Sequence, residues 1–236
     1  MLKINCDMGE GIGNEALLMP YIDAANIACG YHAGDEATME RVVKLCIEYG
    51  VDIGAHPSFP DKENFGRTNM YLPADELYRI VTDQLIILGN IAGKCGTVMR
   101  HVKPHGALYN MAAKDEVIAS VIAKAVYDLD PSLIYYGLSG SVMIKEAERL
   151  GLRAANEVFA DRTYQADGSL TPRTSANALL ADEQSVIRQM NQFRDGKVTC
   201  VNGDIISLKA DTVCIHGDGE HAIGFAKAIH KLLYEE

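Results

Sequence analysis

Short apolar runs alternate with longer amphipathic segments along the whole chain. Seven apolar runs have the length of a β-strand, near residues 3–7, 26–30, 51–55, 100–103, 133–138, 152–156 and 212–216. Between them, apolar residues recur at the helical spacing i, i+3, i+4 and i+7, first over residues 39–47, where Gly50 is placed to end the helix. The same spacing predicts helices over residues 77–88, 117–125, 186–193 and 222–233. Each such stripe needs a sheet to pack against.

The alternation of strands and helices predicts a mainly parallel sheet with right-handed crossovers. Several strands carry polar residues on one face, such as Asn5 with Asp7, which favours a closed or nearly closed barrel over an open sheet. We therefore predict an α/β fold, a single-domain seven-stranded β/α barrel over residues 1–236. Asn202-Gly203 lies between two alternating apolar runs and predicts an added hairpin near residues 197–210. Pro73 precedes the 77–88 stripe and is tolerated in the first turn of a helix.

Composition narrows the class of protein. The chain has 236 residues and a formal net charge of −10, which argues against a nucleic-acid-binding surface. The N-terminus has no signal-peptide pattern, and no apolar run is long enough to span a membrane. The six cysteines include no Cys-x-x-Cys pair, so we expect reduced thiols and a cytoplasmic protein. An anionic substrate would need a local group of Arg and Lys to overcome the negative charge.

Reactive side chains collect just after the predicted strands, where parallel α/β proteins build their active sites. The joint occurrence of five residues at the ends of four separate strands indicates an enzyme: Asp7, His56, Lys103, His105 and His216. Other candidates in the same segments are Glu10, His32, Asp35, Glu157, Asp161, Arg162 and Asp218. Asp35 and Asp218 could equally cap the helices that follow them.

Metal binding is an alternative explanation of this group. Asp7, His56 and His105 could hold a zinc-type ion that activates water, although no His-x-x-x-His spacing supports it. The sequence therefore leaves both possibilities, a site with a divalent metal ion and a site without one. Gly9, Gly11 and Gly13 predict a tight loop, but the lysine of a P-loop is missing. If ATP is used, the sequence does not show this chain to be its main phosphate-binding site.

Longer blocks around these residues resemble the signature blocks of a known family. They are Asn5-Cys-Asp-Met-Gly-Glu10, Ala28-Cys-Gly-Tyr-His-Ala-Gly-Asp35, Gly54-Ala-His-Pro-Ser58, Lys103-Pro-His-Gly-Ala-Leu-Tyr109, Glu157-Val-Phe-Ala-Asp-Arg162 and His216-Gly-Asp218. In this order, and over essentially the whole chain, they resemble the LamB/YcsF family, also called the family of 5-oxoprolinase A-subunits. The resemblance implies a barrel related to those of polysaccharide deacetylases and some glycoside hydrolases.

The resemblance also implies a reaction and partners. The family's activity is hydrolysis of 5-oxo-L-proline to L-glutamate, with ATP converted to ADP and phosphate, together with two partner subunits, 5-oxoprolinase subunits B and C. That reaction needs a base for water, an acid for the ring nitrogen and cations for anionic groups. We expect Asp7 or His56 as base, His105 or His216 as acid, and Lys103 with Arg162 as a cationic clamp. The remaining candidates named above are expected to bind substrate.

Two other functions fit the same residues. A metal-dependent deacetylase or amidohydrolase acting alone would work without ATP and would lose activity to a chelator. A non-catalytic subunit that binds 5-oxoproline would keep its ligand after loss of the strand-end histidines and aspartates. Neither a nucleic acid nor a membrane is expected as a partner.

Overall fold

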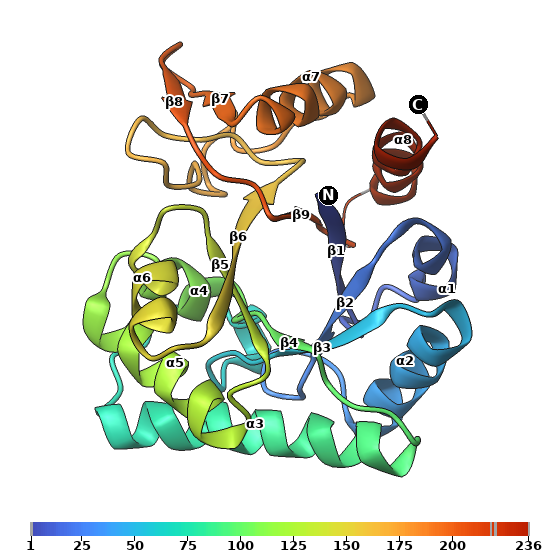
Figure 1. Cartoon of the computed structure of the whole chain (residues 1–236), viewed down its shortest axis with the longest axis vertical. Coiled ribbons are helices and arrows are strands. Elements are labelled where there is room, and N and C mark those ends of the chain that lie inside the picture. Colours follow the sequence, from blue (N-terminus) through green and yellow to red (C-terminus); the bar gives the residue numbers. More distant parts are fainter. Residues whose placement is uncertain (1, 218, 220, 236) are drawn as a thin grey trace.

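Seven parallel strands close into a barrel at the centre of the molecule (Figure 1). The computed structural model describes residues 2–217, 219 and 221–235. Neighbours around the barrel follow the order β1-β2-β3-β4-β5-β6-β9, and β9 pairs with β1 to close it. The strands are β1 (Lys3–Met8), β2 (Ala24–Ala28), β3 (Asp52–His56), β4 (His101–Val102), β5 (Ile134–Leu138), β6 (Arg153–Phe159) and β9 (Thr212–Ile215). The predicted fold class, a seven-stranded β/α barrel, is confirmed.

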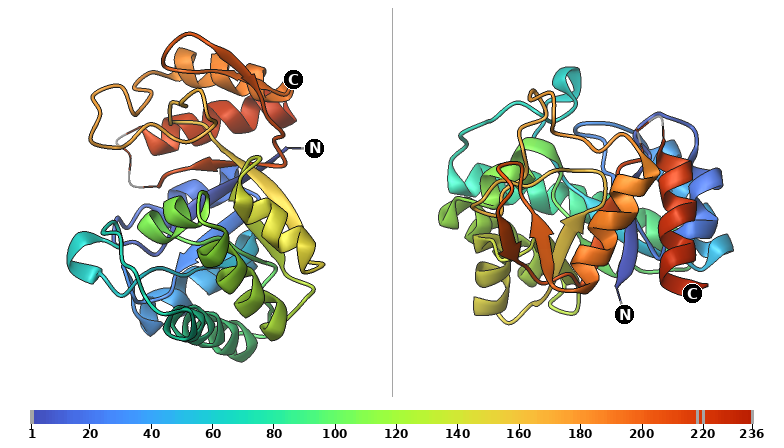
Figure 2. Two further views of the ribbon diagram at one scale, coloured as in Figure 1. Left: turned by 90° about the vertical axis from the view of Figure 1, so that its left-hand side faces the viewer. Right: turned by 90° about the horizontal axis from the view of Figure 1, so that it is seen from above.

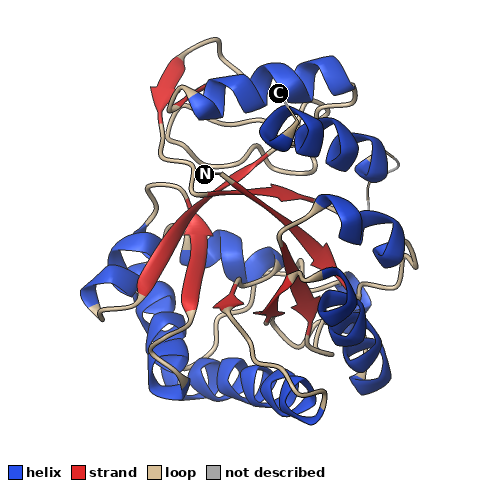
Figure 3. Ribbon diagram, turned by 45° about the vertical axis from the view of Figure 1, so that its right-hand side comes forward, coloured by secondary structure: helices blue, strands red, loops and turns tan. Residues whose placement is uncertain are grey.

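Helices cover the outside of the barrel (Figure 3). They are α1 (Glu15–Leu18), α2 (Glu36–Tyr49), α3 (Ala74–Lys94), α4 (Gly106–Ala112), α5 (Glu116–Leu129), α6 (Val142–Arg149), α7 (Glu183–Arg194) and α8 (Ala222–Tyr234), with short 3₁₀ turns η1 (Met19–Tyr21) and η2 (Lys62–Asn64). Local sequence sets their ends. The Asp35 side chain accepts from the Thr38 N–H at the start of α2, and Gly50 ends that helix in the left-handed conformation.

Some details of the predicted helices were wrong. Pro73 is the residue before α3 rather than part of its first turn. Val117 was assigned to the apolar stripe of α5 but is 67% exposed, because it lies in the first turn beside the Asp115 cap. The short helices α1, α4 and α6 were not predicted, since they offer too few turns for a periodic apolar pattern.

The apolar core lies between the sheet and the helices, whereas the interior of the barrel is polar. Leu85 and Leu88 of α3 are fully buried against this layer. Inside the barrel, His101 donates to Asn26, Asn26 donates to Asn5, and Asn5 donates to Thr212. These groups are buried and joined by hydrogen bonds, which gives the barrel a polar interior in place of layers of branched apolar residues.

The connection from β6 to β9 carries an addition to the barrel. After α7, β7 (Lys197–Thr199) and β8 (Ile205–Ser207) form an antiparallel pair at the expected hairpin, next to α7 in Figures 1 and 2. A five-residue connection containing Asn202-Gly203 joins them. All six cysteines are free thiols. Among the described residues, no helix combines the length and apolar character needed to cross a membrane.

Candidate active site

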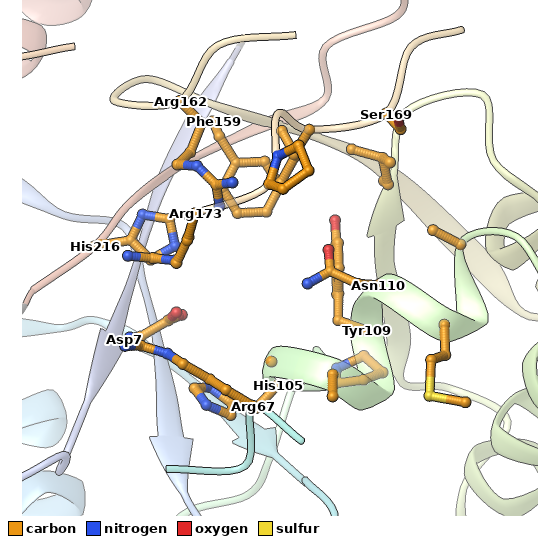
Figure 4. Close-up of a pocket in the computed structure, with 18 of the residues that line it drawn as sticks. Asp7, Arg67, His105, Tyr109, Asn110, Phe159, Arg162, Ser169, Arg173 and His216 are labelled. Carbon is orange, nitrogen blue, oxygen red and sulfur yellow. The ribbon is translucent and has the colours of Figure 1, made fainter. Parts of the chain in front are cut away.

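A cavity of about 600 Å³ opens at the carboxyl ends of the barrel strands (Figure 4). Its walls come from segments far apart in the sequence. Asp7 of β1 and His216 after β9 lie on one side, and Tyr109 and Asn110 of α4 lie across the opening from them. The volume falls in the range of small-molecule sites and far exceeds what one five-membered ring occupies.

Asp7 and Lys103 form an ion pair at the base of the cavity. The Lys103 ammonium lies 2.8 Å from Asp7 Oδ1 and 3.0 Å from Glu157 Oε1, and it also donates to Cys214 Sγ at 3.0 Å. Asn26 donates a second hydrogen bond to Asp7 Oδ1. Burial alone would raise the pKa of Asp7, but its neighbours His56 and Lys103 outweigh it and hold the pKa well below its usual range. Asp7 is therefore an ionised, fixed carboxylate.

Glu10, His32, His56 and His105 converge beside Asp7. Gly9 turns the chain after β1 with a φ of +74°, which brings Glu10 back over the imidazoles. Glu10 Oε1 lies 3.0 Å from His32 Nε2 and 3.4 Å from His105 Nδ1. Burial, together with the neighbouring imidazoles, holds the pKa values of His32 and His105 well below the ordinary value, which favours neutral rings.

His216 is oriented by a buried carboxylate. Its Nδ1 lies 2.9 Å from both oxygens of Asp161, and its ring stacks on Phe159. Burial raises the pKa of Asp161, but His216 more than compensates, so the pKa falls below its usual value. The ionised carboxylate accepts a hydrogen bond from the Nδ1–H group of His216. Nε2 is then the ring nitrogen that can exchange a proton with a bound molecule. This is the arrangement of an imidazole prepared for general acid–base work.

Basic residues line the cavity of this acidic chain: Arg67, Lys114, Arg162 and Arg173. Arg162 is tied to the backbone, because its guanidinium donates to the carbonyls of Thr171 and Ala178. Burial and the nearby Arg173 lower the pKa of Arg162 to about 10.

The predicted site residues that the structure describes separate into three groups. The structure brings seven of them to the cavity wall: Asp7, Glu10, His56, Lys103, His105, Arg162 and His216. Three lie directly behind that wall, His32 against His105, Glu157 against Lys103 and Asp161 against His216. Asp35 lies outside the cavity lining, because its side chain caps α2. Asp218 falls outside the described residues.

Several lining residues were not singled out from the sequence. Arg67 and Phe65 come from the loop between β3 and α3, Arg173 from the loop after β6, and Tyr109 and Asn110 from α4. Tyr109 lies within a quoted motif block, so its position after Lys103 and His105 was a usable signal. Arg67 and Arg173 lie in loops without periodicity, where only the need for local cations in an acidic chain could have suggested them.

Comparisons with known proteins find similar sequences over the whole chain. The LamB/YcsF family model matches residues 2–236. The 5-oxoprolinase A-subunit from Geobacillus kaustophilus (strain HTA426) is 51% identical over 240 residues, covering 100% of this chain and 94% of the relative. The 5-oxoprolinase A-subunit from Bacillus subtilis (strain 168) is 50% identical over 238 residues, covering 98% of this chain and 93% of the relative.

Solved structures show the same architecture. A lactam utilization protein from Thermus thermophilus superposes with a TM-score of 0.92 at 36% identity, covering 99% of this chain and 96% of that one. A family 4 carbohydrate esterase from Streptomyces lividans, in complex with acetate, has a TM-score of 0.52 at 11% identity, covering 99% and 88%. That second likeness concerns the barrel fold alone.

Proposed function

Because this chain belongs to the LamB/YcsF family, we propose that it is the lactam-opening subunit of an ATP-consuming 5-oxoprolinase. The substrate is 5-oxo-L-proline and the product is L-glutamate. The observation that carries the proposal is the cavity itself, where Asp7 and the oriented His216 face a space lined by Arg67 and Arg173. These are the groups needed to move protons at a lactam and to hold its carboxylate.

We assign Asp7 as the base for water and His216 as the acid for the ring nitrogen. Asp7 is held ionised by Lys103, and His216 can transfer a proton through Nε2 while Asp161 holds Nδ1. Lys103 therefore serves to fix Asp7 and Glu157, rather than as the anion clamp expected from the sequence. We assign anion binding to Arg173, which lines the cavity, because the guanidinium of Arg162 is occupied by backbone carbonyls.

Coupling to ATP answers a chemical difficulty. An amide carbonyl is a poor electrophile, and phosphorylation of the lactam oxygen would make the ring carbon susceptible to water. The basic lining and the surplus volume of the cavity suit such a phosphorylated substrate. We assign ATP use to the assembled complex with subunits B and C. We further propose that the complex is cytoplasmic and that residues 1–236 form one domain.

Reconstitution tests this function. The purified chain is mixed with its two partner subunits, 5-oxoproline and ATP, and glutamate is measured with each component omitted in turn. We expect glutamate only when all components are present. Glutamate from this chain alone, without ATP, would contradict the division of labour and favour an independent amide hydrolase.

A further inference from the structure

The hydrogen bonds of His56 and His105 determine where each ring carries its proton. His56 Nδ1 lies 2.7 Å from the backbone oxygen of Lys103, and His105 Nε2 lies 2.9 Å from the backbone oxygen of Phe65. A carbonyl oxygen only accepts hydrogen bonds, so both of these nitrogens must be N–H donors. When each ring holds one proton, His56 Nε2 and His105 Nδ1 are the nitrogens that carry the lone pairs.

Those two lone pairs face each other. His56 Nε2 and His105 Nδ1 are 2.9 Å apart. Two carboxylate oxygens add to the same point, since Asp7 Oδ2 lies 3.4 Å from His56 Nε2 and Glu10 Oε1 lies 3.4 Å from His105 Nδ1. With one proton on each ring, four acceptors therefore converge in a buried space, and this arrangement needs either a shared proton or a metal cation among them.

The backbone supports this arrangement at a conformational cost. Phe65, whose carbonyl orients His105, has a φ of +57° and is the one non-glycine residue with positive φ in the described part of the chain. A bulky residue in this region is uncommon and marks a place that the surrounding structure holds in position. Histidine ligands of metal ions characteristically donate their second N–H to a backbone carbonyl or a carboxylate, as both rings do here.

We propose that Glu10, His56 and His105 bind one divalent transition-metal ion of the zinc class, with Asp7 Oδ2 beside it. This proposal deepens the proposed function, because the site lies in the wall of the same cavity. Two imidazole nitrogens and a carboxylate suit Zn²⁺ or Co²⁺, whereas Mg²⁺ prefers an all-oxygen shell. Such an ion, when bound, supplies Lewis acidity and lowers the pKa of a water molecule.

A neighbouring group of possible ligands is less suited. The possible ligand atoms of Asp7, Cys214 and His216 also lie within 4.8 Å of one another. However, the Lys103 ammonium already lies 2.8 Å from Asp7 Oδ1 and 3.0 Å from Cys214 Sγ. A fixed ammonium among these atoms repels a metal ion, so we assign the site to the Glu10 side of Asp7.

His32 is a positioning residue for this site. Its ring stacks on His105 at 3.8 Å between centroids, and its Nε2 lies 3.0 Å from Glu10 Oε1. With the proton on Nε2, His32 donates to Glu10 and fixes the carboxylate. Outer-shell partners of this kind typically contribute about 10–100-fold to metal affinity.

Metal binding by the full chain tests the proposal directly. Chelator-treated protein is titrated with Zn²⁺ by calorimetry and with Co²⁺ by visible absorption, which reports ligand type independently of any activity. We expect one ion per chain, an affinity at least about 100-fold weaker in His56→Gln and Glu10→Gln, a loss of about 10–100-fold in His32→Gln, and no comparable binding of Mg²⁺. Thermal unfolding of each variant verifies that it is folded.

His230→Gln is the matched control, because His230 lies on α8 and its described contacts are with Tyr21, Tyr234 and Glu235. It should bind the ion as the wild type does. The proposal is overturned if the wild type takes up no Zn²⁺ or Co²⁺, or if folded His56→Gln and Glu10→Gln bind as tightly as the control. If the wild type takes up neither ion while the reconstituted complex still forms glutamate, the metal site is rejected and the proposed function stands.

Discussion

At the scale of single residues, His216 shows how one hydrogen bond determines chemistry. Asp161 accepts a hydrogen bond from the Nδ1–H group, with both carboxylate oxygens 2.9 Å from Nδ1. Nε2 is therefore the nitrogen that exchanges protons in the cavity. An asparagine at position 161 could donate its amide N–H to Nδ1 instead. That exchange would favour the other tautomer, in which Nε2 holds the only proton of the ring, so that transfer of this proton to the lactam nitrogen would leave an imidazolate.

We therefore expect Asp161→Asn to lower the turnover of the reconstituted complex by about two to four orders of magnitude. The pH–rate profile should lose the limb that reports His216. Asp182→Asn is the matched control, because Asp182 caps α7 through the Ser185 N–H and asparagine caps equally well. Equal turnover in both variants would show that Asp161 does not orient the catalytic imidazole.

Gly54 reveals a packing constraint inside the barrel. Its backbone lies beside the His101 ring in the paired strand, and a Cβ placed on it would lie 2.0 Å from His101 Nε2. The His101 ring also stacks on Tyr136, so it has little room to move. The glycine is required here by close approach, not by an unusual backbone conformation.

Gly54→Ala should lower the free energy of unfolding by about 1–3 kcal/mol, measured by urea denaturation, through overpacking. Adding His101→Ala to Gly54→Ala should then cost less than His101→Ala alone, because the clash is removed with the ring. Gly93→Ala serves as the control. A Cβ at Gly93 of α3 meets no atom within 4 Å, so that variant should be stabilised by roughly 0.5–1 kcal/mol. Additive losses at Gly54 and His101 would contradict the argument.

From the sequence, only those site residues that lie at the ends of recognisable strands could be predicted. Asp7, His56 and His216 were found because each lies at the end of an apolar strand, and parallel strands bring their carboxyl ends together. The hydrogen bonds that separate their roles depend on distances between loops. Nothing in the sequence shows that the Lys103 ammonium pairs with Asp7 and Glu157, or that the Arg162 guanidinium donates its hydrogen bonds to backbone carbonyls.

At the scale of elements, α3 connects the outer layer to the barrel. It runs from Ala74 to Lys94 and packs against α5 and α2. Leu88 is fully buried in its inner face, whereas Ile86, two residues earlier, is 43% exposed. Replacing Leu88 and Ile86 separately by alanine therefore distinguishes the contribution of core packing from that of helix propensity within one helix.

Leu88→Ala should destabilise the protein by about 2–5 kcal/mol, because it removes buried methyl groups and leaves a cavity. Ile86→Ala should change the free energy of unfolding by less than about 1 kcal/mol, since much of its side chain stays in water. Urea denaturation with an unchanged m value is the measurement. Similar losses for both variants would mean that α3 is not packed as described.

Elements were predictable where a long apolar stripe meets a clear end signal. The stripe over 39–47 and Gly50 located α2, and Asn202-Gly203 located the hairpin. α1 contains four residues, and α4 begins at Gly106 directly after His105. Elements this short carry no periodicity, so tertiary contacts determine them.

At the scale of the whole molecule, charge is divided between surface and cavity. The formal net charge of −10 keeps the surface hydrated but opposes the approach of an anion. Arg67, Lys114 and Arg173 line the cavity and supply local positive potential where an anionic lactam would bind. Deeper in the barrel lie hydrogen-bonded polar groups, among which the His101 imidazole is fully buried.

That burial couples global stability to pH. Burial, with the nearby Lys103 charge, lowers the pKa of His101 to about 3, against an ordinary value of about 6.5 in the unfolded chain. Between these values the unfolded state binds the proton and the folded state does not. The linkage relation therefore requires stability to fall as pH drops through this window, by about 2 kcal/mol for this one group between about pH 7 and pH 4.5.

His101→Gln removes the titrating group but keeps an amide that can donate to Asn26. At neutral pH the variant should be less stable than the wild type, because the stacking on Tyr136 is lost. The difference between the two proteins should narrow by about 2 kcal/mol as the pH falls to about 4.5, because only the wild type carries the proton uptake of His101 on unfolding. Urea denaturation at several pH values measures it. A difference that stays constant with pH would mean that the His101 pKa is similar in the folded and unfolded states, and that the polar interior of the barrel admits a charged imidazole.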